Sequence, residues 1–224
     1  MEYDYDANSQ RTASRTFNAS SVQLYTETTP HTERGWTDYK DTPYRRLDYD
    51  YYANGLLKDT VSSNVNGVNL GYRYDGLNRL EHVDDGASGA VKTTDYSYNA
   101  NGSLETVLTP NGIKHSYTYD TLNRLRSLAI SNTIAAATVR AYEYQHYASG
   151  HRRKIVESNG RTAEYTYDAL YRLKQELITG DPSGKNGLIG YDLDPVGNRK
   201  SRASTLPEVG NQSGLTYNAR DWLV

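Results

Sequence analysis

The sequence predicts an all-β protein made of tandem β-hairpin repeats of about 23–24 residues each, arranged as a long curved antiparallel sheet or a β-spiral wall. Three observations predict this fold. Tyr-x-Tyr pairs recur along the chain, and the alternation of tyrosine with Thr, Ser, Arg or Glu has the two-residue period of a strand. Most pairs are followed by Asp, Asn and Gly, which turns recruit. Open sheets beyond about ten strands curl or close because their twist accumulates.

The Tyr-x-Tyr pairs give the repeat its period. Their first members are 46, 23, 24, 21, 25, 23, 26 and 24 residues apart, and 46 is twice 23, so a worn copy is expected around Leu24-Tyr25. The spacing predicts one repetitive domain over residues 1–224, in which residues 15–48 are a degenerate repeat or an insertion. The pairs are Tyr3/Tyr5, Tyr49/Tyr51, Tyr72/Tyr74, Tyr96/Tyr98, Tyr117/Tyr119, Tyr142/Tyr144 and Tyr165/Tyr167, with degenerate copies at Tyr191/Leu193 and Leu215/Tyr217.

Two classes of unit alternate along the chain. Residues 74–80, 119–125 and 167–173 read Tyr-Asp, two further residues and then Asn or Tyr before Arg-Leu, whereas the units between them carry a glycine. The alternation gives a superperiod of about 47 residues and predicts that consecutive units are not equivalent in three dimensions. The glycines are expected to form turns that need positive φ; they are Gly55, Gly102, Gly150 and Gly197.

Each unit is predicted to contain two strands and two turns. The Tyr-x-Tyr strand leads through the first turn into a second strand, as in residues 103–107 or 124–128. An Asn-Gly turn often follows, at residues 66–67, 111–112 and 159–160, and Asn-Gly favours tight hairpins. Nine or ten such units give roughly 18–20 strands.

The composition predicts a thin wall rather than a thick core. The chain has 224 residues, with 22 tyrosines but one phenylalanine and no cysteine, and Leu, Ile, Val and Phe together number only 39. So few aliphatic residues suggest disorder, but disorder also requires a high net charge, and this charge is −2. The sheet should therefore be lined by tyrosine and exposed to solvent on both faces. Because the charge is small and scattered, no nucleic-acid partner is expected, and no apolar run is long enough for a membrane span.

The recurrent residues of the motif are the candidate structural residues. The aspartate after the tyrosine is expected to start a turn, the arginine to pair with it or cover a tyrosine ring, and the leucine to pack. The set is Tyr72, Tyr74, Asp75, Asn78, Arg79, Leu80, Tyr96, Tyr98, Gly102, Tyr117, Tyr119, Asp120, Asn123, Arg124, Leu125, Tyr165, Tyr167, Asp168, Arg172, Leu173, Asp194, Gly197, Asn198 and Arg199.

No catalytic residue, metal site or cofactor is predicted, and the protein is not expected to be an enzyme. Residues 180–186 imitate a phosphate-binding loop, but they are one residue short and no Ser or Thr follows the lysine. The five histidines lie in different repeats without ligand spacing. A hydrolase hidden in residues 15–48 is a weaker hypothesis.

The repeated Tyr-Asp-x-Leu-Asn-Arg-Leu motif, the Asp-Pro-Val-Gly-Asn-Arg at 194–199 and the period of about 23 residues resemble the YD repeats of bacterial Rhs (rearrangement hotspot) proteins. Insecticidal toxin-complex C components and animal teneurins carry the same repeat. The resemblance implies a continuous β-sheet that spirals into a hollow shell, which in bacterial members encloses a toxic C-terminal domain. It also implies a fragment of a larger shell, in a parent protein that is secreted or on the cell surface, with the toxin or the remaining shell as partner.

Two further expectations concern partners. Rows of exposed tyrosines at strand spacing could stack on sugar rings, so the alternative function is a carbohydrate-binding or cell-surface adhesion module. The terminal strands of an open sheet present unpaired backbone groups, so self-association through open sheet edges is the other expectation. The start of the chain has no basic and apolar segment of the kind that forms a signal peptide.

Overall fold

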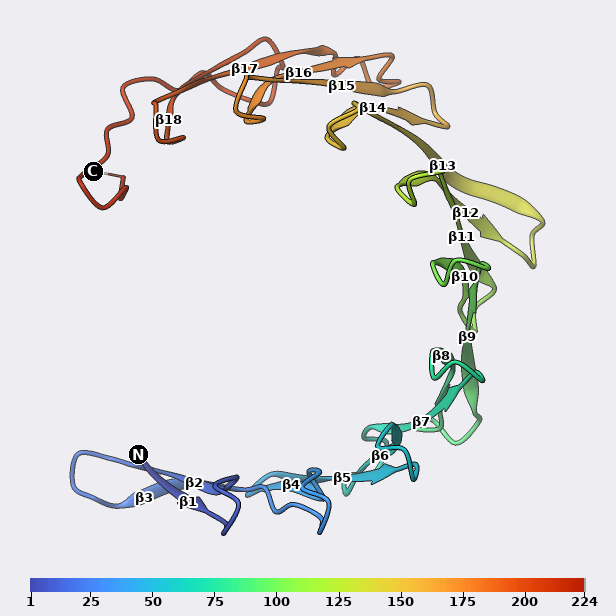
Figure 1. The fold of residues 1–224 in the computed structure, drawn as a ribbon, viewed down its shortest axis with the longest axis vertical. Coiled ribbons are helices and arrows are strands. Elements are labelled where there is room, and N and C mark those ends of the chain that lie inside the picture. Colours follow the sequence, from blue (N-terminus) through green and yellow to red (C-terminus); the bar gives the residue numbers. More distant parts are fainter. Residues whose placement is uncertain (224) are drawn as a thin grey trace. The chain divides into compact units, whose positions relative to one another are not determined.

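The structure is a computed structural model that describes residues 1–223, and it confirms the all-β prediction. Eighteen strands and no helix are found in these residues (Figure 1). The part of the chain described therefore has no helix that could cross a membrane. The strands are β1 (Glu2–Tyr5), β2 (Arg11–Phe17), β3 (Gln23–Thr28), β4 (Tyr39–Thr42), β5 (Arg45–Tyr51), β6 (Leu57–Ser62), β7 (Asn69–Tyr74), β8 (Leu80–Asp85), β9 (Lys92–Tyr98), β10 (Leu104–Leu108), β11 (Ile113–Tyr119), β12 (Leu125–Asn132), β13 (Ala137–His146), β14 (Arg152–Glu157), β15 (Thr162–Tyr167), β16 (Leu173–Thr179), β17 (Gly187–Leu193) and β18 (Arg199–Ser204).

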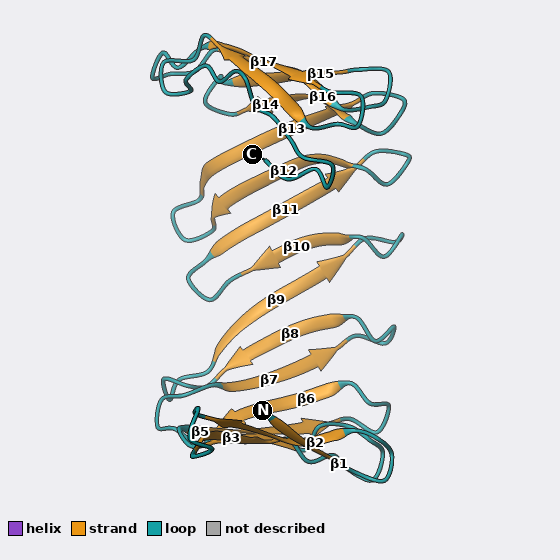
Figure 2. Ribbon diagram, turned by 90° about the vertical axis from the view of Figure 1, so that its left-hand side faces the viewer, coloured by secondary structure: helices purple, strands orange, loops and turns teal. Residues whose placement is uncertain are grey.

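The chain forms two compact units. Unit 1 holds residues 1–97 and 107–111, and unit 2 holds residues 98–106 and 112–223. Within each unit, strands that are consecutive in sequence pair antiparallel, β1 to β9 in unit 1 and β11 to β18 in unit 2 (Figure 2). Each unit is thus an open meander of hairpins, as the tandem repeat predicts. The assignment of residues 1–224 to one domain, and the curvature of the sheet, stay predictions.

One kind of turn connects the strands of most hairpins. In a five-residue segment, the N–H of position 1 donates to the carbonyl of position 5, and the N–H of position 4 donates to the carbonyl of position 1. This is the three-residue hairpin loop with a bulge, which explains the register shift found beside these turns. Position 1 of the twelve turns is Asp6, Asn18, Thr32, Tyr52, Asp75, Asn99, Asp120, Tyr147, Glu157, Asp168, Asp194 and Asn218.

Position 4 of every such turn has positive φ in both classes of repeat. Gly102 has a φ of 82°, as its role as a turn former requires, and Asn123 in the next repeat has a φ of 59°. Asparagine tolerates this left-handed region better than most residues, which is why Asn and Gly alternate there. The expectation that consecutive units are not equivalent is therefore wrong for the backbone of these turns.

The sequence motif of the repeat cannot be recognised in residues 15–48, yet strands β2, β3, β4 and β5 continue through this segment. The turn that matches the others begins at Thr32, so the worn Tyr-x-Tyr copy lies at Thr29 and His31. The position expected from a 23-residue period, Leu24-Tyr25, is wrong because the connection from β3 to its turn is longer than in the other units. Leu24 and Tyr25 lie inside β3.

Very few side chains are buried. The buried apolar residues are Ala13, Ala163, Ile178 and Ile189, and no large side chain among residues 1–223 is fully buried. Half-buried cross-strand pairs also contribute packing, and in these a leucine stands opposite the second tyrosine of a pair. These pairs are Tyr74 with Leu80, Tyr119 with Leu125, and Tyr167 with Leu173. The composition predicted such a thin wall.

The turn backbone can be tested with Gly102→Val. A β-branched side chain at positive φ is strained, so we expect the free energy of unfolding to fall by at least about 1–2 kcal/mol, measured by urea denaturation. Gly76→Val is the matched control, because Gly76 is position 2 of the same kind of turn, does not have positive φ, and has open space around an added Cβ. The control should change stability by less than about 0.5 kcal/mol. Equal losses in the two variants would contradict the assignment.

Candidate functional site

The recurrent residues of the repeat gather at the edge of the sheet where the Tyr-x-Tyr strands end. We call this edge the tyrosine edge. Its turns begin at Asp6, Thr32, Tyr52 and Asp75 in unit 1, and at Asn99, Asp120, Tyr147, Asp168, Asp194 and Asn218 in unit 2. Successive turns along this edge are joined by side chains, and these contacts form the candidate site.

Tyrosine hydroxyls make the first kind of contact between hairpins. In several repeats the tyrosine directly before a turn donates its O–H to the backbone carbonyl of the residue that directly follows the preceding turn. Tyr119 donates to Leu104 at 2.8 Å and Tyr167 to Arg152 at 2.9 Å in unit 2. Tyr51 donates to Thr37 at 3.0 Å in unit 1. Phenylalanine cannot make this bond, which gives a physical reason for a chain with 22 tyrosines and one phenylalanine.

The aspartate at position 1 organises its own turn. Oδ1 of Asp120 accepts the N–H groups of Leu122 and Arg124 at 2.9 Å, and Oδ2 accepts Nε of Arg124 at 2.7 Å. The corresponding residues of the other two copies, Asp75 with Arg79 and Asp168 with Arg172, make the same bonds. The carboxylate therefore holds the turn closed and aims the guanidinium along the edge.

These interactions also set the protonation of the aspartates. The hydrogen bond from the backbone N–H of Arg124, helped by its guanidinium, holds the pKa of Asp120 below its ordinary value, against the opposing effect of partial burial. The same causes, from Arg79 and Arg172, lower the pKa values of Asp75 and Asp168.

The arginine at position 5 reaches the next turn. Nη1 of Arg124 donates to the carbonyl of Tyr147 at 3.0 Å, and Nη1 of Arg172 donates to the carbonyl of Asp194 at 2.8 Å. In both cases the acceptor belongs to position 1 of a glycine-class turn. One guanidinium thus closes its own turn and binds the neighbouring one.

The glycine-class turns make a different contact to the turns that follow them. The side chain at position 5 touches the side chain at position 4 of the next turn, the residue with positive φ. Ser103 donates to Oδ1 of Asn123 at 2.6 Å, and Nδ2 of Asn198 donates to Oδ1 of Asp221 at 2.9 Å. In unit 2 the two kinds of contact alternate along the tyrosine edge, which gives the two-unit superperiod a physical cause.

His151 and Tyr171 are the variant of this contact that the sequence pattern did not reveal. Their rings are stacked, 4.8 Å apart between centroids with an angle of 8°. Tyr171 has a φ of 60°, a strained conformation for a bulky residue, and stacking against His151 offsets part of that cost. The signal that could have found the pair is the tyrosine that replaces asparagine in the third copy of the motif.

The remaining candidate residues take other positions. Asn198, and not Arg199, occupies position 5 of its turn and donates to Oδ2 of Asp194 at 3.1 Å, while Arg199 begins β18 and donates to Gln212. Gly197, at position 4 of this turn, has a φ of 104°. Five candidates lie half-buried in strands, namely Tyr72 in β7, Tyr96 and Tyr98 in β9, Tyr117 in β11 and Tyr165 in β15.

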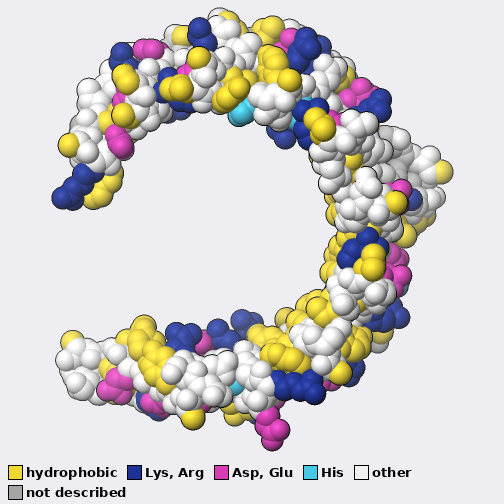
Figure 3. All heavy atoms as spheres, in the orientation of Figure 1, with side chains coloured by type: hydrophobic (Ala, Val, Ile, Leu, Met, Phe, Trp, Pro, Cys, Tyr) yellow, Lys and Arg dark blue, Asp and Glu magenta, His cyan; other side chains and the backbone are white. Residues whose placement is uncertain are grey.

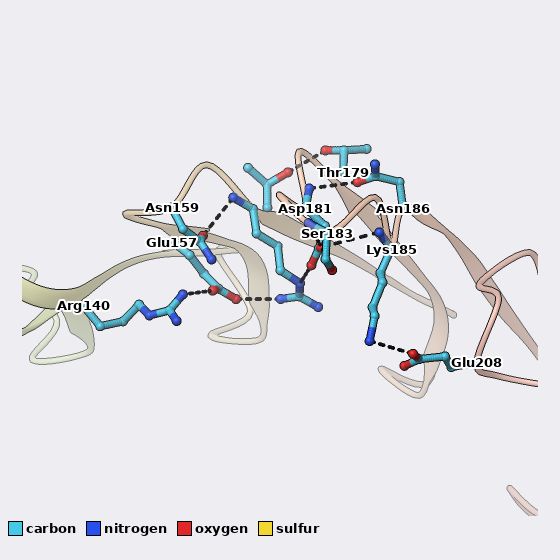
Figure 4. Close-up of polar contacts among 11 residues, drawn as sticks. Arg140, Glu157, Asn159, Thr179, Asp181, Ser183, Lys185, Asn186 and Glu208 are labelled. Atoms are coloured by element: carbon cyan, nitrogen blue, oxygen red, sulfur yellow. Dashed lines mark hydrogen bonds and ion pairs between the residues drawn. The ribbon is translucent and has the colours of Figure 1, made fainter.

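The opposite edge of unit 2 is held by ion pairs. Glu157 accepts Nη1 of Arg161 at 2.7 Å and Nη1 of Arg140 at 3.2 Å, and Arg161 also reaches Asp181 at 3.4 Å (Figure 4). Residues 180–186, the segment that imitates a phosphate loop, lead into strand β17. There Asp181 accepts bonds from Ser183. Arg161 thus links neighbouring hairpins, and it also lines a pocket together with Asp181 and Lys185.

The surface outside these contacts is mixed. Hydrophobic, basic and acidic side chains are interspersed over the visible face of both units (Figure 3). No three His, Asp or Glu side chains in residues 1–223 are grouped so that they could hold a metal ion.

The tyrosine contact can be tested with Tyr119→Phe. This change removes one hydroxyl and leaves the carbonyl of Leu104 without that donor, so the free energy of unfolding should fall by about 0.5–1.5 kcal/mol in urea denaturation. Tyr171→Phe is the matched control, because its exposed ring keeps the stack on His151, and it should stay within about 0.5 kcal/mol. If Tyr119→Phe is as stable as the wild type, the hydroxyl does not join the hairpins.

A pH dependence follows from the aspartates. Because their pKa values are lowered in the folded state, the stabilisation is present above the unfolded value of about pH 4 and is lost as the pH falls through the folded value. The urea midpoint should therefore decrease between pH 5 and pH 3. Asp120→Asn keeps an oxygen for the backbone N–H groups, as Asn99 does in its own turn, and should show a smaller decrease. An unchanged decrease would refute this origin.

Comparison with known proteins gives a fold but no family. No protein-family model and no curated protein sequence matches this chain. Among solved structures, the TcdB2-TccC3-Cdc42 crystal structure matches 98% of this chain with a TM-score of 0.74 and 14% identity. The TcdB2-TccC3 crystal structure without the hypervariable C-terminal region matches 93% with a TM-score of 0.70 and 17% identity.

A third match is the Photorhabdus luminescens Tc holotoxin pore with a mutated TccC3, over 96% of this chain, with a TM-score of 0.57 and 14% identity. This chain spans only 14%, 12% and 13% of the three matched chains, respectively. At such identities the likeness establishes the fold alone. The fold of this chain is therefore similar to that of a segment of these three structures.

Proposed function

We propose that this chain is a YD-repeat scaffold of the Rhs type, which forms part of the wall of a hollow shell that encapsulates or displays a toxin or effector domain. The observation that carries the proposal is the succession of side-chain contacts along the tyrosine edge. In unit 2 they join six successive turns, so the repeated polar residues connect hairpins instead of forming one unusual constellation. A wall needs this arrangement, and catalysis does not.

The fold likeness supports the same function. One matched structure is a Tc holotoxin pore that contains TccC3, the other two also contain TccC3, and this chain resembles a small part of each. The partner is then the enclosed toxin or effector domain, or the remainder of the shell, and the parent protein is secreted or held at the cell surface. The proposal includes no enzymatic activity and no cofactor for this segment.

The repeat tyrosines give less support to the alternative, a carbohydrate-binding or adhesion module. Tyr51, Tyr119 and Tyr167 are half-buried, and their hydroxyls already donate to backbone carbonyls. A row of such tyrosines offers little free ring surface to a sugar.

Protease protection tests the scaffold. The chain is expressed together with the segments that its gene encodes beside it, and the accessibility of those segments to protease is followed by mass spectrometry. A wall should protect them, and Arg124→Ala combined with Arg172→Ala should reduce the protection because two links between turns are lost. The matched control is Arg126→Ala with Lys174→Ala, exposed strand residues without such a link. Equal cleavage with and without this chain would refute the proposal.

A further inference from the structure

Residues 15–48, where the repeat motif is hardest to recognise, form most of a groove in unit 1. Strand β4 is only four residues long and pairs with β3 through Thr28 and Asp41, so the hairpin of β4 and β5 ends early. The sheet edge is set back at this point, beside the first half of β3. A groove of about 580 Å³ occupies this part of the sheet face, and we call it the tyrosine groove. Its principal residues are Tyr25, Glu27, Lys40, Tyr44, Tyr49 and Asn64.

Aromatic rings line this groove. Tyr44 lies in the turn between β4 and β5 and is 80% exposed, and its ring is 6.5 Å from that of Tyr25 at an angle of 30°. Tyr49 of β5 also lines the groove. Within unit 1, no other turn at the sheet edge opposite the tyrosine edge carries a tyrosine. Tyr44 is therefore a departure from the repeat that exposes a large apolar ring, and such departures mark functional positions.

A charged pair also lines the groove. Nζ of Lys40 is 3.0 Å from the carboxylate of Glu27, whose side chain is only 17% exposed. Arg11 reaches the same carboxylate at 4.0 Å. The carboxylate is thus held in place with both cations beside it, and it offers fixed acceptors next to fixed donors.

This combination suits a saccharide. A pyranose ring has an apolar face of C–H groups that stacks on a phenol ring, and a rim of hydroxyls that both donate and accept hydrogen bonds. We propose that the tyrosine groove binds a sugar, stacked on Tyr44 and hydrogen-bonded to Glu27 and Lys40. The groove volume is in the range of about 300–1,000 Å³ that small-ligand sites occupy. The tyrosine groove is separate from the tyrosine edge, so the proposal of sugar binding does not depend on the proposed scaffold function.

Saturation-transfer difference NMR on the 224-residue chain tests the site, with methyl glycosides of glucose, galactose, mannose and N-acetylglucosamine as probes. At least one glycoside should give a saturable signal in the millimolar range. Tyr44→Ala should weaken binding about tenfold or more, because an aromatic ring that the bound sugar covers dominates such contacts, whereas Tyr44→Phe keeps the ring and should bind within about threefold of the wild type.

Two further variants complete the test. Glu27→Gln should weaken binding because it replaces two acceptor oxygens with one. Tyr171→Asn removes an exposed tyrosine from unit 2, where asparagine suits the backbone, and should leave binding unchanged. The proposal is overturned if no glycoside gives a saturable signal, if Tyr44→Ala binds like the wild type, or if Tyr171→Asn loses as much affinity as Tyr44→Ala. Because Tyr44 is 80% exposed, its variants should keep the wild-type far-ultraviolet circular dichroism spectrum.

Discussion

A sheet one layer thick has no core to hold its hairpins side by side. In this protein, hydrogen bonds from tyrosine hydroxyls to backbone carbonyls of the neighbouring hairpin help to hold them together. Folding must offset the conformational entropy of every ordered residue, and four buried apolar side chains contribute little toward it. Tyr119 stands opposite Leu125 in a cross-strand pair, and its hydroxyl donates to the carbonyl of Leu104. One side chain thus supplies apolar contact and a hydrogen bond between hairpins, a combination that leucine and phenylalanine lack.

The two classes of unit have one backbone and two surfaces. Position 4 has positive φ in both, so the turn itself does not distinguish them. The difference lies at position 5, where Arg124 extends to the carbonyl of the following turn, whereas Ser103 meets the side chain of the following turn. The alternation is therefore a property of the contacts between turns.

The fold was predictable because its signals are local. Alternating tyrosines indicate strands, and the Asp, Asn and Gly that follow them indicate turns, so the period, the strand count and the turn glycines could be predicted from the sequence. What depends on a neighbouring hairpin could not be predicted. The acceptor of the Tyr119 hydroxyl is fifteen residues away, and the place of Arg199 depends on Asn198 taking position 5. The worn copy in residues 15–48 was misplaced because its loop departs from the common length.

The alternating contacts also bear on how such a chain can change in length. Each contact joins unlike turns, so deleting one glycine-class repeat would place two arginine-bearing turns next to each other. The side chain at position 4 of the second turn would then lose its partner at position 5 of a glycine-class turn. Deleting or duplicating two units together, about 47 residues, restores every pairing. Two consecutive repeats are thus the smallest segment that can be duplicated while every side-chain contact between turns is kept. Gene duplication in such a chain is expected to add or remove repeats two at a time.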